Sequence, residues 1–329
     1  MESVLLFCAR LKWQQQKIKR AYFSFLSSLG GAWFIALRWP WPSSRPWRRK
    51  SLRIAAPGKG IGDELMCLPV LQELKRRNPT CVLTFVARNF RLFVGQPFID
   101  RLEPAGSEPN PSTLRLEYAY KMPPPRPIIT HLAESLGLQL TTKRLIPPNI
   151  SPDRELCEQI EQIPKPRIVI QPEASKWTPN KDWPASRWDE LVDMLLESGS
   201  VIEVGVDSRL SRSRRHTNFH SYVGRTDLEG FAYIIREAQL FIGPPSGGMH
   251  LANAFGVPSV IIFGGYESPG GFEYSKTTPL FTKLPCSPCW LTTPCPYDKK
   301  CLTAISPASV KDAALGWLRM VESTPINPP

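Results

Sequence analysis

Residues 243–265, GPPSGGMHLANAFGVPSVIIFGG, combine a strand end, a glycine turn, a short helix and the following strand. Gly and Pro at positions 243–248 end the apolar run that precedes them, and residues 258–264 form a second short run rich in β-branched side chains. A strand, a helix and a second strand in this order are typical of a βαβ unit. The stretch therefore predicts a parallel α/β sheet.

The glycine turn in this stretch suits an anion. Gly247 and Gly248 remove side chains where the predicted helix begins and its free N–H groups point outward. Such a helix start attracts phosphate. Ser246 can cap the helix or donate to the anion, and His250 in the first turn would face the same side. A purely structural role, with Ser246 as a cap and His250 as a satisfied polar residue, stays open.

A similar pattern occurs near the start of the chain. Residues 52–79, LRIAAPGKGIGDELMCLPVLQELKRRNP, predict a buried strand, a glycine-rich turn and one helix that Asn78–Pro79 ends. The helix is favoured by a stripe of leucine at every third position, from Leu65 to Leu74. Residues 81–87 predict the next strand, so this region also begins a βαβ unit.

The glycines of this first turn, at positions 58, 60 and 62, are spaced G-x-G-x-G. This spacing matches neither the dinucleotide fingerprint nor the phosphate loop. Asp63 and Glu64 follow in the first turn of the helix, where an acid caps the helix and suits its dipole. On spacing alone this structural role is favoured over the alternative, in which the glycines lack side chains so that a ligand can approach the helix start.

The same order of elements restarts in the second half. Residues 167–175, 200–205 and 258–264 predict strands, while residues 183–199, 226–238 and 306–321 predict helices. A helix is also expected near residues 128–138, and the Pro-rich and charged residues 141–166 are expected to form a linker. We therefore predict a leader over residues 1–50, an N-terminal domain over 51–155 and a C-terminal domain over 156–329. Two such domains would leave a ligand cleft between the carboxyl ends of their strands.

The leader carries most of the net charge of +12, because residues 1–50 hold ten Lys or Arg residues and one acid. Its 17 uncharged residues, Ala21 to Leu37, are flanked by basic and Trp-rich segments. This composition favours a segment that lies on the inner face of the membrane, on a cytoplasmic protein. A flexible basic arm, which binds nothing specific or nucleic acid without specificity, and a membrane span are the alternatives.

Four cysteines lie close together in residues 286–301, CSPCWLTTPCPYDKKC, with the spacing C-x₂-C-x₅-C-x₅-C. Four thiolates in one loop can surround a tetrahedral zinc or iron ion of structural role. The candidate ligands are Cys286, Cys289, Cys295 and Cys301. Two disulfides or idle thiols are the alternatives, and without a secretory signal we expect reduced thiols.

Taken together, these residues resemble glycosyltransferase family 9, the heptosyltransferases of lipopolysaccharide assembly, over nearly everything after residue 51. Four pieces match in order: LRIAAPGKGIGDELMCLPVLQELKRRNP, IVIQPEAS with NKDWPASRW, GRTDLEG, and SGGMHLANAFGVP. No piece is decisive alone, but their order and spacing are specific.

The resemblance implies a GT-B fold, in which two Rossmann-like domains face a central cleft. It also implies inverting transfer of heptose or a related sugar, from an ADP-linked donor to a saccharide or glycolipid acceptor of the cell envelope. Asp63 would be the catalytic base and Lys181 would bind the donor diphosphate. The other implied substrate-binding residues are Gly60, Gly62, Thr226, Ser246, Gly247, Gly248 and His250.

The implied mechanism needs no catalytic cofactor or metal, because fixed N–H dipoles and Lys181 would stabilise the leaving diphosphate. No specific nucleic-acid partner is expected. A helix N-terminus would lower the pKa of Asp63, so its hydroxyl substrate would release the proton late in the reaction. The family has Asp where this chain has Pro245. This departure favours one alternative, an inactive nucleotide-sugar-binding relative. A nucleotide-sugar epimerase of GT-B shape, which would need further acids in the cleft, is the other alternative.

Overall fold

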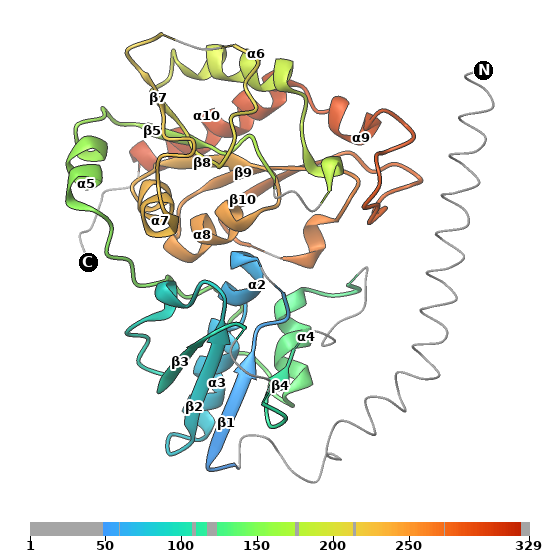
Figure 1. Cartoon of the computed structure of the whole chain (residues 1–329). Helices are drawn as coiled ribbons and strands as arrows, with labels where there is room; N and C mark the ends of the chain where they lie inside the picture. Colours follow the sequence, from blue (N-terminus) through green and yellow to red (C-terminus); the bar gives the residue numbers. More distant parts are fainter. Residues whose placement is uncertain are drawn as a thin grey trace.

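The computed structural model describes residues 49–323, except residues 59, 107–109, 117–123, 175–177, 213–214 and 273. The predictions for the leader therefore lie outside the described residues, apart from Arg49 and Lys50. Strands form two separate sheets in which every strand pairing is parallel, which confirms the predicted α/β class (Figure 1).

The N-terminal sheet has four strands in the order β3-β2-β1-β4. They are β1 (Ser51–Ala55), β2 (Val82–Ala87), β3 (Arg101–Pro104) and β4 (Leu114–Arg115). The helical segments of this half are α2 (Ile61–Leu65), α3 (Leu68–Arg77), η2 (Phe90–Phe93) and α4 (Ile128–Ser135). The glycine turn lies directly after β1 and leads into α2.

The single helix predicted after this turn is in fact two helices, α2 and α3. Pro69 lies in the first turn of α3, and it lacks the N–H that would bond to the carbonyl of Leu65. The chain therefore breaks at Met66 and Cys67. The leucine stripe survives the break, since Leu65, Leu68, Leu71 and Leu74 are all fully buried.

The C-terminal sheet has six strands in the order β10-β9-β8-β5-β6-β7. They are β5 (Arg167–Ile170), β6 (Ser200–Glu203), β7 (Phe219–Ser221), β8 (Leu240–Gly243), β9 (Ser259–Phe263) and β10 (Thr277–Phe281). Counted within this half, the order is 3-2-1-4-5-6, which is that of a Rossmann fold. The order reverses between β5 and β8, and this switch point is where such sheets bind ligands.

Helices cover both faces of the C-terminal sheet (Figure 1). The segments are η3 (Pro179–Lys181), α6 (Ala185–Leu195), α7 (Leu228–Arg236), α8 (Gly247–Phe255), η4 (Pro269–Gly271), α9 (Lys300–Thr303) and α10 (Pro307–Ser323). Alternate residues of β5 serve the two faces: Ile168 and Ile170 pack with α6 and α10, whereas Val169 packs with α7 and α8. The core on the α7–α8 side continues into the N-terminal sheet.

The linker predicted over residues 141–166 contains a helix, α5 (Arg154–Glu161), which Asp153 caps by accepting from the N–H groups of Glu155 and Leu156. The domain boundary predicted at residue 155 falls in the first turn of this helix and stays a prediction. Within the part of the chain that the structure describes, no helix combines the length and apolar character needed to cross a membrane.

Candidate active site between the two sheets

Both glycine turns lie at switch points of their sheets. The first follows β1, which pairs with both β2 and β4, and the second follows β8 beside β5. At the second switch point Ser246 Oγ donates a hydrogen bond of 2.8 Å to Gln171 Oε1, in the loop after β5. Each turn thus stands where a parallel sheet offers its carboxyl-end crevice.

The structure brings the two turns together, because α2 and α8 meet with their N-terminal ends in contact (Figure 1). A Cβ atom on Gly247 would lie 3.4 Å from Ile61 Cδ1, and one on Gly62 would overlap the ring of His250. Gly62 is therefore needed for the close approach of the two helices. The predicted carboxylate and the predicted phosphate-binding helix start share one interface.

Asp63 lies at the start of α2, and its carboxylate folds back over the glycine turn. Asp63 Oδ2 accepts a hydrogen bond of 3.4 Å from the Gly60 N–H, and a Cβ atom on Gly58 would fall on the same carboxylate. Burial raises the pKa of Asp63, while the Gly60 N–H and the charge of Lys181 act in the opposite direction. The expectation of a lowered pKa was therefore wrong, because loss of solvent outweighs the helix terminus.

Lys181 lies at the end of η3, close to the second turn. Its Nζ is 2.5 Å from Glu267 Oε1, donates to the Pro245 carbonyl at 3.2 Å and lies 5.0 Å from the centre of the Tyr266 ring. The charges of Lys181 and Glu267 both act on the pKa of Asp63, so the three groups belong to one electrostatic site. Pro245, at the position where the family resemblance predicts an aspartate, offers Lys181 only its carbonyl.

Sequence reasoning missed Glu267, which is 6% exposed and follows β9. The available signal was a carboxylate directly after the carboxyl end of a predicted strand, in GGYESP. Such positions line the ligand crevice of a parallel sheet.

His250 is buried in the first turn of α8. Its Nδ1 lies 2.6 Å from Tyr274 Oη, and its ring packs edge-to-face with the rings of Phe272 and Tyr274. Burial, together with the charge of Lys181, lowers the pKa of His250 to about 3. His250 is therefore neutral near pH 7 and can act on a ligand only as a dipole.

Among the residues that the structure describes, no side chain caps the start of α8. Ser246 is the N-cap residue, but its hydroxyl bonds to Gln171 and makes no cap hydrogen bond. Gly248 was predicted to leave room for an anion. In the structure it leaves room for Gln171 Oε1 and the Phe241 ring, which a Cβ atom at this position would overlap. With respect to the described part of the chain, the first N–H groups of the helix can therefore bind an anion.

Two other residues have local roles. Glu64 is buried and accepts from the backbone N–H groups of Arg88 and Asn89 and from the Asn89 side chain, so it fixes the loop after β2. Thr226 precedes the N-cap of α7, Asp227, which accepts from the Gly230 N–H at 2.8 Å. The predicted contact of Thr226 with the donor stays a prediction.

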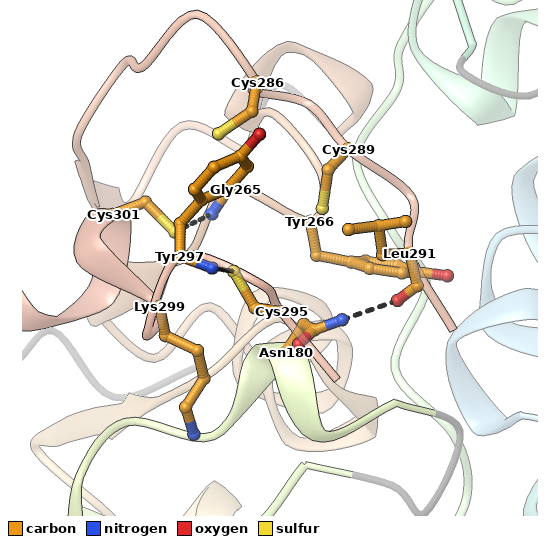
Figure 2. A pocket seen from close by; sticks show the side chains of 10 residues that line it. All are labelled: Asn180, Gly265, Tyr266, Cys286, Cys289, Leu291, Cys295, Tyr297, Lys299 and Cys301. Carbon is orange, nitrogen blue, oxygen red and sulfur yellow. Dashed lines mark hydrogen bonds between the residues drawn. The ribbon is translucent and has the colours of Figure 1, made fainter. Parts of the chain in front are cut away.

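The four clustered cysteines line one pocket, together with Gly265, Tyr266, Asn180, Leu291, Tyr297 and Lys299 (Figure 2). All are free thiols. Cys301 Sγ accepts from the Gly265 N–H at 3.0 Å, and Cys295 Sγ accepts from the Tyr297 N–H at 3.4 Å. Among the described residues, no three His, Cys, Asp or Glu side chains stand close enough together to hold a metal ion as they lie.

Two parallel α/β sheets whose switch points face each other have the arrangement of the GT-B fold, which the similar solved glycosyltransferases share. A family model described as glycosyltransferase family 9 (heptosyltransferase) matches residues 129–295, slightly more than half of the 329 residues. The chain belongs to this family.

Known relatives agree with this assignment. Lipopolysaccharide heptosyltransferase 1 of Escherichia coli K12 is 29% identical over 90 residues, which span 26% of this chain and 28% of that relative. The E. coli ADP-heptose lipopolysaccharide heptosyltransferase II structure is 16% identical, with a TM-score of 0.62 over 84% of this chain and 100% of that one.

A third similar structure is the iron-containing dodecameric glycosyltransferase TibC from enterotoxigenic E. coli H10407. It is 20% identical, with a TM-score of 0.64 over 83% of this chain and 77% of that one. TibC has also been solved in complex with ADP-D-β-D-heptose. At these identities the structural matches show the fold alone.

Proposed function

We propose that this protein is an inverting glycosyltransferase that moves heptose or a related sugar from an ADP-linked donor to a saccharide or glycolipid of the cell envelope. One observation carries the proposal: the Asp63 carboxylate and the open N-terminus of α8 lie at the same contact between the two sheets. An inverting transfer needs these two groups, a base for the acceptor hydroxyl and donors for the leaving diphosphate.

Asp63 is proposed as the base. Its raised pKa makes it a better proton acceptor than an ordinary aspartate, since burial favours the protonated product of the transfer. The acceptor hydroxyl loses its proton to Asp63 as its oxygen bonds to the anomeric carbon. The Gly60 N–H keeps the carboxylate in place during this step.

Lys181 and the first N–H groups of α8 are proposed to hold the diphosphate. As the bond to the sugar breaks, negative charge grows on the diphosphate, and these groups stabilise it without reorganising. The Glu267 carboxylate and the Pro245 carbonyl hold the Lys181 ammonium in position beside α8. Fixed donors of this kind can take the place of a metal ion in the transfer step.

The test is turnover with a panel of ADP-, UDP- and GDP-linked sugars, comparing the wild type with Asp63→Asn. We expect one donor class to be used and the variant to lose on the order of 10²–10⁴ in rate. Glu190→Gln, an exposed acid on α6, is the matched control and should keep full activity. Equal turnover by Asp63→Asn would remove Asp63 as the base, and binding without any turnover would favour an inactive relative.

We further propose that the four-cysteine pocket holds a structural zinc or iron ion. Two of its thiols, those of Cys295 and Cys301, accept N–H···S bonds as metal-bound thiolates do. The three non-glycine residues with positive φ among those described, Trp290, Asp298 and Lys299, all lie in this loop. A bound ion would draw the thiols together. Anaerobically purified protein should contain about one zinc or iron per chain, and Cys295→Ser should lose it; a metal-free wild type would overturn this proposal.

The leader is proposed to attach the protein to the inner face of the membrane. Anionic vesicles should therefore co-sediment with the full chain more strongly than neutral vesicles, and added salt should weaken the binding. Equal binding to neutral vesicles, or none to either, would contradict this proposal.

A further inference from the structure

A second cavity, of about 220 Å³, is lined by Glu267, the ion-pair partner of Lys181, and is built by both halves of the chain. Pro124, Pro125 and Ile128 come from the N-terminal half, before and at the start of α4; Glu267, Ser268, Gly271 and Phe272 follow β9; Pro288 and Trp290 come from the cysteine loop. The volume is below the range of roughly 300–1,000 Å³ of sites for drug-sized ligands, so it suits a single ring rather than a whole nucleotide sugar.

The walls of this cavity are mostly rings and apolar side chains. Phe272 is 7% exposed, and the Trp290 ring is held against the Tyr266 ring with centroids 4.9 Å apart. The Trp290 backbone N–H also donates to the Tyr266 carbonyl at 3.1 Å. Aromatic faces are electron-rich and attract the slightly positive C–H groups of a sugar ring.

One buried charge breaks this apolar lining, the carboxylate of Glu267. It is held by Lys181 at 2.5 Å, so its position is fixed before a ligand arrives. Charge-assisted hydrogen bonds from hydroxyls to a carboxylate are among the stronger ones in proteins. Because Pro245 offers no side-chain acceptor, Glu267 is the carboxylate that stands beside Lys181 at this place.

The cavity connects to the proposed chemistry along two sides. On one side, Glu267 contacts Lys181, whose charge acts on Asp63. On the other, Phe272 packs against His250 at 5.3 Å between ring centres, and His250 lies on Gly62, next to Asp63. A ring in this cavity would contact Glu267 and Phe272, which in turn contact Lys181 and His250.

From these contacts we propose that this cavity binds a sugar ring, with Trp290 and Phe272 as its platform and Glu267 as its hydroxyl acceptor. The inference rests on the proposed transferase function only for its role in turnover, because binding of a ring can be measured separately. The ring is either the sugar being transferred or the sugar that receives it, and both share this chemistry.

Saturation-transfer NMR with methyl pyranosides tests the binding without turnover. The wild type should transfer saturation to at least one glycoside, and Trp290→Ala should abolish the effect. Trp290→Phe should keep most of it, and Glu190→Gln all of it. Unchanged signals in Trp290→Ala and Glu267→Gln, or no signal with any wild-type sample, would overturn the proposal.

Kinetics separate the two sources of the ring. If it is the donor sugar, Trp290→Ala should raise the KM of the nucleotide sugar about tenfold, a loss of ~1.4 kcal/mol, and leave the Kd of ADP unchanged. If it is the acceptor sugar, only the acceptor KM should rise. A wild type that turns over no nucleotide sugar would refute the transferase, whereas normal constants in an active Trp290→Ala enzyme would refute the sugar cavity alone.

Discussion

The two glycine turns look alike in the sequence, but their glycines make room for different neighbours. In the first turn, Gly58 leaves space for a carboxylate five residues later, that of Asp63. In the second, Gly248 leaves space for Gln171 and Phe241, which belong to neighbouring strands and loops. In the first turn the missing side chain makes room for the carboxylate that we propose as the base, whereas in the second Gly248 makes room for the sheet beneath it. A missing side chain therefore does not by itself indicate a ligand.

The largest expected effect comes from Gly58→Ala, which tests the first turn. Its methyl group would fall on the Asp63 carboxylate and move it from the Gly60 N–H. We expect kcat/KM to fall on the order of 10²-fold, toward the level of Asp63→Asn. Steady-state kinetics with the preferred donor measure this effect.

Gly60→Ala is the matched control, because its Cβ atom would keep an ordinary 3.4 Å from Asp63 Oδ2 and its φ of −87° suits alanine. It should lose much less activity. If both variants were as active as the wild type, the position of the Asp63 carboxylate would not matter to turnover.

Individual residues show which features of the fold could be predicted from the sequence. Short apolar runs and the leucine stripe predicted the sheets and helices, because these signals are local. Pro69 was also local, and its break between α2 and α3 was available to prediction. The neighbours of the second turn could not be predicted, because Ser246 bonds to Gln171, which lies 75 residues earlier in the chain.

The charged residues of the site could be identified from the sequence, but their protonation depends on contacts between distant parts of the chain. Asp63 and Lys181 were reached through the family resemblance, but the loss of solvent around Asp63 depends on packing between two halves of the chain. Its pKa was therefore expected in the wrong direction. His250 was placed correctly at the start of α8, while its neutrality depends on burial that no local pattern reports.

The contact between the turns should give the next largest effect. Gly62→Ala would drive a methyl group into the His250 ring and separate α2 from α8. Overpacking of this kind destabilises by about 1–3 kcal/mol, measured as a lower midpoint in urea. The double variant Gly62→Ala/His250→Ala should recover part of that loss, because the second change removes the obstructing ring. Strict additivity of the two single variants would mean that the helices do not touch here.

The second turn offers a smaller and purely structural contrast. Gly248→Ala should lower stability by about 1 kcal/mol or more, because Gln171 and Phe241 must move. Gly247→Ala, whose methyl group would make ordinary contact with Ile61, should change stability by less than about 0.5 kcal/mol. Thermal melts of both variants measure the difference. A tolerated Gly248→Ala with a damaging Gly247→Ala would reverse the assignment of the two glycines.

The smallest expected effect is a change in thermal stability when the Asp63 carboxylate is removed. Burial raises the pKa of Asp63 in the folded chain above its usual value, so the folded state holds its proton more tightly than the unfolded state. Stability therefore falls as pH rises through this interval, and the ionised carboxylate costs stability at pH 7. Asp63→Asn should melt on the order of 2 °C higher than the wild type at pH 7, with the difference closing as pH approaches 3.8. A lower melting temperature for Asp63→Asn at pH 7 would mean that the bond from the Gly60 N–H to the carboxylate outweighs the cost of burying the charge, and that Asp63 stabilises the first turn.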